Sequence, residues 1–132
     1  MKKRELPKPT GAELAVLRVL WHRGPSTVRD VLEDVADERS VGYTTVLKIM
    51  QIMTEKGLLE RDSSRRTHVF RPALSEEQTQ HRLVEDLMEG AFGGSAQKLV
   101  MRVLSAQPAS GEEIAQIRQL LNELEGDEKC TD

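Results

Sequence analysis

The sequence predicts a mainly α-helical protein, with three helices and a small β-hairpin over residues 1–72 and a helical region over residues 73–132. Aromatic residues are only 3% of the 132 residues, so the core must be built from aliphatic side chains, which suits helix packing. Apolar residues recur at helical spacing along most of the chain, and one short region is strand-like. The length suits one ordinary domain with a small appendage.

The net charge of the chain changes sign between residues 1–72 and residues 73–132. Residues 1–72 carry 14 Lys and Arg against 10 Asp and Glu, a net charge of +4, whereas residues 73–132 carry 5 against 12, a net charge of −7. A basic half beside an acidic half indicates one surface that meets phosphate and another that stays off it. With so few charges, chance can also produce such a difference.

The first two helices are predicted from Thr10 to His22 and from Ser26 onward. Thr10 and Glu13 match a capping box, and Gly24-Pro25 ends the first helix. Ser26 is predicted to cap the second helix with its hydroxyl. The inward faces are Leu14, Leu17 and Trp21 with Leu20 beside them, and then Val28, Val31, Leu32 and Val35; the outward face of the second helix is Arg29, Asp30, Glu33 and Asp34.

A third helix is predicted to follow the polar residues 37–42 and to end at Gly57. Four apolar residues recur at i, i+3, i+4 and i+7, which is one face of a helix, and four polar residues cluster opposite them. The apolar face is Val46, Ile49, Met50 and Met53, and the polar face is Thr44, Lys48, Gln51 and Glu55.

A hairpin with a basic tip is predicted next. Residues 58–62 and 67–71 are strand-like, residues 63–66 (Ser-Ser-Arg-Arg) form the turn, and Pro72 closes the second strand. Three helices followed by a hairpin is the order of a winged helix-turn-helix. We therefore predict a winged helix-turn-helix DNA-binding domain over 1–72 and a helical dimerisation domain over 73–132.

Residues 73–132 predict three amphipathic helices. Capping boxes begin at Ser75 and Ser110, and Gly93-Gly94 and Pro108 separate the helices. Short helices bury their apolar stripes by packing, and two-fold self-association is the commonest arrangement. We therefore expect a homodimer, the alternative being that these helices fold back on residues 1–72.

The third predicted helix has the side chains that a recognition helix needs near its N-terminus. Hydroxyls of Thr44 and Thr45 can bond phosphate or a base edge, Lys48 can reach guanine or phosphate, and Gln51 can pair with adenine in the major groove. Any solvated helix face has a similar composition, so this helix alone does not decide. Tyr43 either donates its hydroxyl to a phosphate or staples the helix entry by packing its ring.

Two arginines at the hairpin tip strengthen the case for DNA. Arg65 and Arg66 can enter the minor groove or clamp adjoining phosphates, and Arg61 and Arg71 can extend the patch along the strands. The alternative is an edge hairpin kept soluble by its charge.

Enzymatic and metal chemistry find little support. The three histidines lack ligand spacing, and the single Cys130 lies two residues from the end. No apolar run is long enough to span a membrane, and the start lacks a signal-peptide core. We expect a cytoplasmic protein that is not an enzyme, with no cofactor, metal or membrane partner.

Several stretches carry a resemblance to a known family: ELAVLRVLW over 13–21, GPSTVRDVLEDV over 24–35, YTTVLKIMQIMTEKGLL over 43–59, and HVFRP over 68–72. With Phe92-Gly-Gly and residues 112–124 in the tail, the chain resembles the penicillinase repressor family of the BlaI/MecI/CopY type. The run Gly-Tyr-Thr-Thr-Val followed by Lys-Gly-Leu and Arg-Pro is fairly specific, whereas the C-terminal similarity is mostly helical patterning.

This resemblance implies a homodimeric repressor whose two recognition helices read half-sites of an inverted-repeat operator, typically with TACA and TGTA, and block transcription. It implies DNA contacts by Thr44, Thr45 and Lys48, with Arg65 and Arg66 as hairpin contacts. It assigns dimerisation to Leu83, Leu87, Phe92, Leu99, Val103, Ile117 and Leu121.

The sequence lacks the features through which relatives in this family respond to their inducing signals. Relatives that respond to β-lactams are cut at an Asn-Phe bond where this sequence has Arg102-Val103, and copper-responsive relatives have a cysteine cluster that Cys130 alone cannot reproduce. An inducing protease or sensor therefore stays unidentified. The rival to a sequence-specific repressor is a winged-helix protein-protein interaction module, in which the acidic tail docks a partner.

Overall fold

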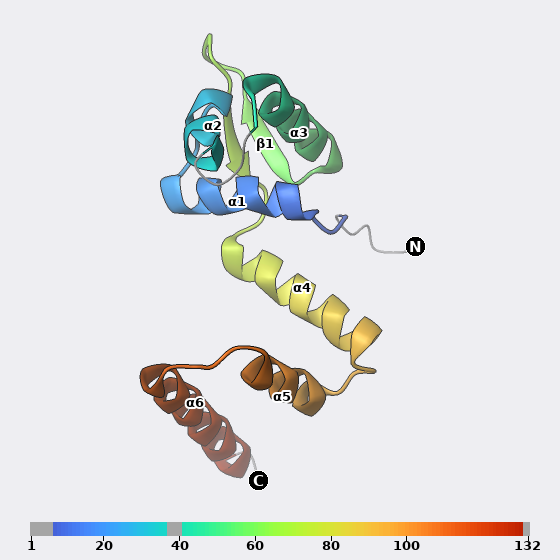
Figure 1. The fold of residues 1–132 in the computed structure, drawn as a ribbon, viewed down its shortest axis with the longest axis vertical. Coiled ribbons are helices and arrows are strands. Elements are labelled where there is room, and N and C mark those ends of the chain that lie inside the picture. Colours follow the sequence, from blue (N-terminus) through green and yellow to red (C-terminus); the bar gives the residue numbers. More distant parts are fainter. Residues whose placement is uncertain (1–6, 37–40, 131–132) are drawn as a thin grey trace. The chain divides into compact units, whose positions relative to one another are not determined.

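The computed structural model describes residues 7–36 and 41–130, and the polar connection predicted over 37–42 lies mostly outside them. The chain divides into two compact units, Met1–Glu85 and Asp86–Asp132. The functional boundary predicted at Pro72 stays a prediction. Along the described residues, the elements follow the predicted order (Figure 1): α1 Gly11–Arg23, α2 Val28–Ala36, α3 Tyr43–Lys56, β1 Leu59–Asp62, β2 Val69–Pro72, α4 Glu76–Ala91, α5 Ala96–Ala106 and α6 Gly111–Cys130.

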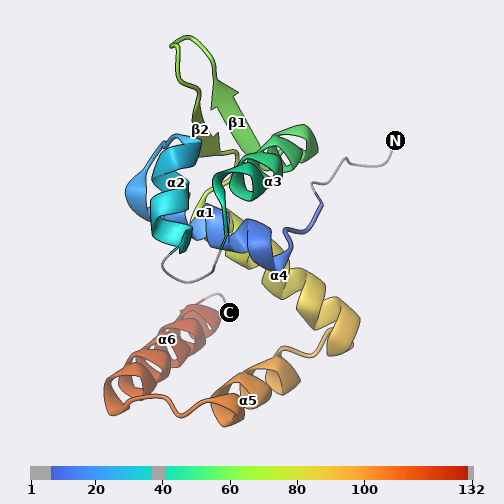
Figure 2. The ribbon, with the colours of Figure 1, turned by 45° about the horizontal axis from the view of Figure 1, so that its top comes forward.

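The first unit is built around one aliphatic core to which three helices and the hairpin contribute. Leu20 of α1, Val31 of α2 and Met50 of α3 are at most 1% exposed, and Phe70 of β2 is 2% exposed. Burying one such side chain fully contributes roughly 1.5–3 kcal/mol. α2 and α3 flank the hairpin, α1 crosses its base, and the hairpin tip projects beyond the helices (Figure 2). The predicted winged helix-turn-helix is confirmed.

α1 begins with the predicted capping box. The Glu13 backbone N–H donates to Thr10 Oγ1 at 3.2 Å, and the Thr10 N–H donates to Glu13 Oε1 at 3.0 Å. Glu13 Oε2 also accepts from Lys56 Nζ at 2.7 Å, with the Glu13 side chain only 6% exposed. This ion pair joins the start of α1 to the end of α3, and removing one partner would leave the other charge poorly compensated.

The predicted cap of α2 is wrong: Thr27, not Ser26, occupies that position. The Asp30 N–H donates to Thr27 Oγ1 and the Thr27 N–H donates to Asp30 Oδ2, both at 3.1 Å. The Ser26 backbone is engaged elsewhere, because its N–H and carbonyl pair with Phe70 at 3.0 and 2.8 Å. Ser26 therefore lies antiparallel to β2 and adds one residue of extended chain beside it.

α3 begins at Tyr43, and Gly57 follows its last residue, as predicted. Gly57 has a left-handed φ of 89°, which favours glycine, and its N–H donates to the carbonyl of Thr54. Val46, Met50 and Met53 are at most 1% exposed. The predicted inward face of this helix is confirmed, with Ile49 half-buried at its margin.

The hairpin is antiparallel, with Glu60 opposite Arg71 and Arg61 opposite Phe70. Trp21 of α1 lies against the core, as predicted, and its indole Nε1 donates to the Leu74 carbonyl at 3.1 Å, just after β2. This bond ties the C-terminal end of the hairpin to α1.

The C-terminal helices also begin where the sequence predicts. Reciprocal bonds join Ser75 with Gln78 and Ser110 with Glu113, which confirms both capping boxes. α5 is capped by Ser95, whose hydroxyl accepts from the Lys98 N–H at 3.1 Å. None of the residues of α5 is buried.

Replacing Thr27 with alanine should lower the free energy of unfolding by about 1 kcal/mol, because the N-cap hydroxyl and its reciprocal bond with Asp30 are lost. Urea denaturation followed by circular dichroism measures this. Thr44→Ala, which changes an exposed threonine of α3, is the matched control and should stay within about 0.5 kcal/mol of wild type. Equal effects of the two substitutions would contradict the assignment of the cap to Thr27.

Candidate nucleic-acid interface

The outward face of α3 is polar and exposed, because the opposite face is in the core. Thr44, Thr45, Lys48 and Gln51 are all exposed, and Tyr43 at the helix start is 43% exposed. Among the described residues, no hydrogen bond or ion pair engages the Lys48 ammonium group. These side chains are available to a partner outside the chain.

The hairpin tip presents Arg65 and Arg66, both exposed. The Ser64 N–H donates to Asp62 Oδ1 at 2.9 Å, which orders the start of the turn. The pKa of Asp62 is lowered chiefly by this backbone hydrogen bond, with Arg71 and Arg65 adding smaller electrostatic contributions. Arg65 therefore has a negative charge close by.

A hollow of about 640 Å³ lies between α2, α3 and the hairpin. It brings together some of the predicted site residues but not all: Tyr43, Gln51 and Arg66 line it, whereas Thr44, Thr45, Lys48 and Arg65 are not among its lining residues. The full lining is Thr27, Val28, Arg29, Tyr43, Leu47, Gln51, Arg61, Arg66, Thr67, His68 and Phe70.

Arg29 is a charged lining residue that sequence reasoning missed as a functional candidate. Its guanidinium carbon lies 5.6 Å from the centroid of the Tyr43 ring, a cation–π arrangement. Helical periodicity indicates only that Arg29 faces outward from α2. The contact with Tyr43 is long-range, so no local pattern in the sequence could have indicated it.

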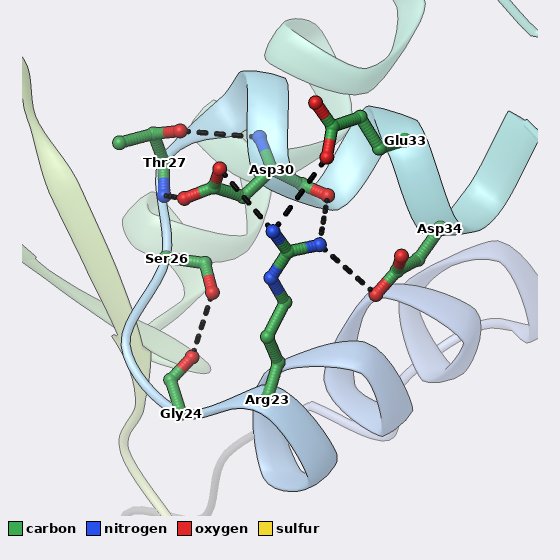
Figure 3. Close-up of polar contacts among 7 residues, drawn as sticks. All are labelled: Arg23, Gly24, Ser26, Thr27, Asp30, Glu33 and Asp34. Carbon is green, nitrogen blue, oxygen red and sulfur yellow. Dashed lines mark hydrogen bonds and ion pairs between the residues drawn. The ribbon is translucent and has the colours of Figure 1, made fainter.

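The other charged residues of α2 are held by Arg23 at the end of α1 (Figure 3). The Arg23 guanidinium lies 3.4 Å from Asp30, 3.6 Å from Glu33 and 3.2 Å from Asp34, and it donates to the Asp30 carbonyl at 2.9 Å. Each of these side chains is at least one-third exposed, so a single pair contributes little. Together the contacts join the end of α1 to the acidic side of α2.

The predicted dimerisation residues lie on α4, α5 and α6, or just after α4. Leu87, Val103 and Leu121 are 47%, 58% and 56% exposed. Leu83, Phe92, Leu99 and Ile117 are half-buried. Within the described ranges, no helix is long and apolar enough to cross a membrane, and no three His, Cys, Asp or Glu side chains are grouped as metal ligands would be.

The sequence model of the penicillinase repressor family matches residues 9–123, which is most of this chain. The chain belongs to the penicillinase repressor family. This repressor is 22% identical to the penicillinase repressor of Bacillus licheniformis over 120 residues, which cover 91% of this chain and 94% of that protein.

It is also 30% identical to the transcriptional regulator BlaI of Mycobacterium tuberculosis over 115 residues, 86% of this chain and 82% of that protein. Among solved structures, the transcriptional regulator Tm0710 of Thermotoga maritima aligns with a TM-score of 0.50 at 17% identity, over 93% of this chain and 78% of that chain. That likeness supports the fold alone.

The Asp30 carboxylate gives the repressor a pH-dependent contribution to stability. Its pKa is lowered chiefly by the hydrogen bond from the Thr27 backbone, with further help from the Thr27 side chain and Arg23. A carboxyl whose folded pKa is below the unfolded value near 3.8 stabilises the fold above that pH, and the contribution disappears as the pH falls through the folded pKa.

Asp30→Asn should therefore lower the melting temperature near pH 7, and its difference from wild type should shrink as the pH falls from about 4 towards 2. Thermal unfolding by circular dichroism across this range measures the effect. Glu55→Gln, a matched change at an exposed carboxylate of α3, should leave the melting temperature near pH 7 close to that of wild type. A gap for Asp30→Asn that persists unchanged at low pH would contradict the electrostatic account.

Proposed function

We propose that this repressor acts as a homodimer on a palindromic operator, binding double-stranded DNA through α3 and the hairpin. The observation that carries the proposal is the exposed polar face of α3 beside the basic hairpin tip, both attached to one core. A recognition helix needs a rigid support and short polar side chains, and α3 has both. Membership of the family makes the chain a transcriptional repressor.

Within this proposal, each exposed residue has a role set by its chemistry. Thr44, Thr45 and Lys48, near the start of α3, contact base edges and phosphates in the major groove, and Gln51 pairs with adenine. Tyr43 directs its hydroxyl at a phosphate while its ring holds Arg29. Arg65 and Arg66 of the hairpin take the adjoining minor groove or its phosphates.

The apolar residues left uncovered on the C-terminal helices support a dimer. Of the large apolar side chains on α5 and α6, seven are 39% to 63% exposed, namely Val100, Met101, Val103, Leu104, Leu120, Leu121 and Leu124. Exposed apolar surface on this scale marks an interaction site. A two-fold symmetric dimer would also present two copies of α3 related by the same symmetry as the two halves of a palindrome.

A repressor meets its DNA in the cytoplasm, which is the location we propose, and it needs no catalytic group or cofactor. We propose no inducing protease or sensor. The rival function, a winged helix used only for protein contacts, would leave Lys48 and Arg66 without a role in binding.

DNA binding is tested by fluorescence anisotropy with a duplex from the region upstream of the repressor's own gene and a scrambled duplex, at several salt concentrations. We expect preference for the upstream duplex and a steep decrease in affinity with salt. Changing both Arg65 and Arg66 to alanine should weaken binding at least about tenfold.

The matched control changes two exposed arginines elsewhere, Arg18 and Arg118, to alanine, and should leave affinity within about twofold of wild type. Equal, weak binding of both duplexes by the wild-type protein would favour the protein-interaction module.

The dimer is tested by sedimentation equilibrium. The wild-type protein should have twice the chain mass of 14.9 kDa. Leu121→Glu should raise the dissociation constant at least about thirtyfold, the equivalent of about 2 kcal/mol, because a charge enters an apolar interface. Since Leu121 is 56% exposed in the single chain, the helical circular dichroism of the variant should equal that of the wild-type protein.

Gln116→Glu adds the same charge at an exposed polar position of α6, and should leave the dimer intact. A wild-type monomer, or an equally strong dimer after Leu121→Glu, would refute the assignment of this surface to dimerisation.

A further inference from the structure

The hollow between α2, α3 and the hairpin gathers positive charge from three separate elements. Arg29 comes from α2, Arg61 from β1 and Arg66 from the turn of the hairpin. None of the described residues that line it is acidic. The volume of about 640 Å³ equals that of roughly twenty water molecules, so the hollow accommodates more than one small ion.

Two arginines of this unit are paired with carboxylates, unlike the three that line the hollow. Arg23 contacts three carboxylates and Arg71 Nε donates to Glu60 Oε1 at 3.0 Å. Across the described residues, no ion pair joins Arg29, Arg61 or Arg66 to a carboxylate. All three of these arginines line the hollow, so the charge there is available to an anion from outside the chain.

Arg29 is held in place without being neutralised. Its guanidinium stacks over the Tyr43 ring at 5.6 Å, and Tyr43 begins α3. An aromatic ring orients an arginine while leaving its five N–H donors free for phosphate oxygens. Beside these cations, Val28, Leu47 and Phe70 supply apolar lining.

We propose that this hollow holds the DNA sugar-phosphate backbone that separates the major groove from the minor groove, and that Arg29 is its central phosphate contact. The inference rests on the proposed function. If α3 enters the major groove and the hairpin enters the adjoining minor groove, the strand that separates these grooves has to pass between them. Both elements line the hollow at that place.

The same geometry separates the roles of the two hairpin arginines. Arg66 lines the hollow and contacts the backbone, whereas Arg65 is not among the lining residues and interacts with Asp62. Arg29 and Arg66 therefore supply affinity that does not depend on sequence, and Arg65 is left for the minor groove.

The experiment compares Arg29→Gln with wild type on a scrambled duplex, by anisotropy titration from about 50 to 200 mM salt. Losing one phosphate contact should reduce the slope of log affinity against log salt by about 1. The ratio of wild-type to variant affinity should then be roughly 3.5-fold larger at 50 mM than at 200 mM. On the upstream duplex, affinity should fall by a similar factor, with preference between the duplexes unchanged.

Arg18→Gln removes one exposed arginine from α1 and is the matched control, expected to keep the wild-type slope. Arg29→Lys keeps the positive charge and should restore most of the slope. This result would exclude a loss of folding as the cause of the change in slope of Arg29→Gln. Circular dichroism of Arg29→Gln verifies its fold independently.

Wild-type binding with a slope that Arg29→Gln leaves unchanged would overturn this inference and leave the proposed function standing. Loss of preference for the upstream duplex would also overturn it, because Arg29 would then read a base. Inorganic phosphate that displaces DNA at constant ionic strength from wild type, and not from Arg29→Gln, would support the inference, because phosphate and the DNA backbone would then compete for the same hollow. A wild-type protein that binds neither duplex would overturn both proposals.

Discussion

The burial of one face of α3 is the constraint on which the proposed interface depends. Val46, Met50 and Met53 are almost completely inaccessible, and at about 100° per residue their burial directs Lys48 and Gln51 outward. Rotating the helix by one residue would move charged or polar groups towards an aliphatic core without partners, which costs several kcal/mol. The direction of the polar face is therefore determined by packing, before any DNA is present.

The position of the hairpin depends on a second, smaller constraint. Ser26 exchanges two backbone hydrogen bonds with Phe70, whose ring is also in the core, and Thr27 then caps α2. The turn before α2 and the strand β2 are thereby fixed to each other. Because Arg29 follows Thr27 by two residues, these hydrogen bonds also determine the position of Arg29 relative to the hairpin.

Local features of this fold could be predicted from the sequence, and long-range pairs could not. Capping boxes and apolar periodicity involve residues within about four positions of one another, so α1, α3, α4 and α6 were predicted with nearly correct starts. Ser26 looked like an N-cap because a hydroxyl before an apolar run is the usual signal, but its partner, Phe70, is 44 positions away. The side chains Thr44, Lys48 and Gln51 followed from periodicity, whereas the pairing of Arg29 with Tyr43 required the folded chain.

Which arginines are paired with carboxylates also depends on the folded chain. This pairing changes how the basic half of the chain is interpreted. Sequence counting treats every arginine alike, yet Arg23 and Arg71 are matched by carboxylates while Arg29 and Arg66 are not. Pairing Arg23 with the acidic side chains of α2 also holds those carboxylates, which would otherwise repel phosphate. The net charge of +4 over residues 1–72 is therefore less informative than its placement. A DNA surface of this kind needs few uncompensated cations, provided that the neighbouring acidic groups are bound to other arginines.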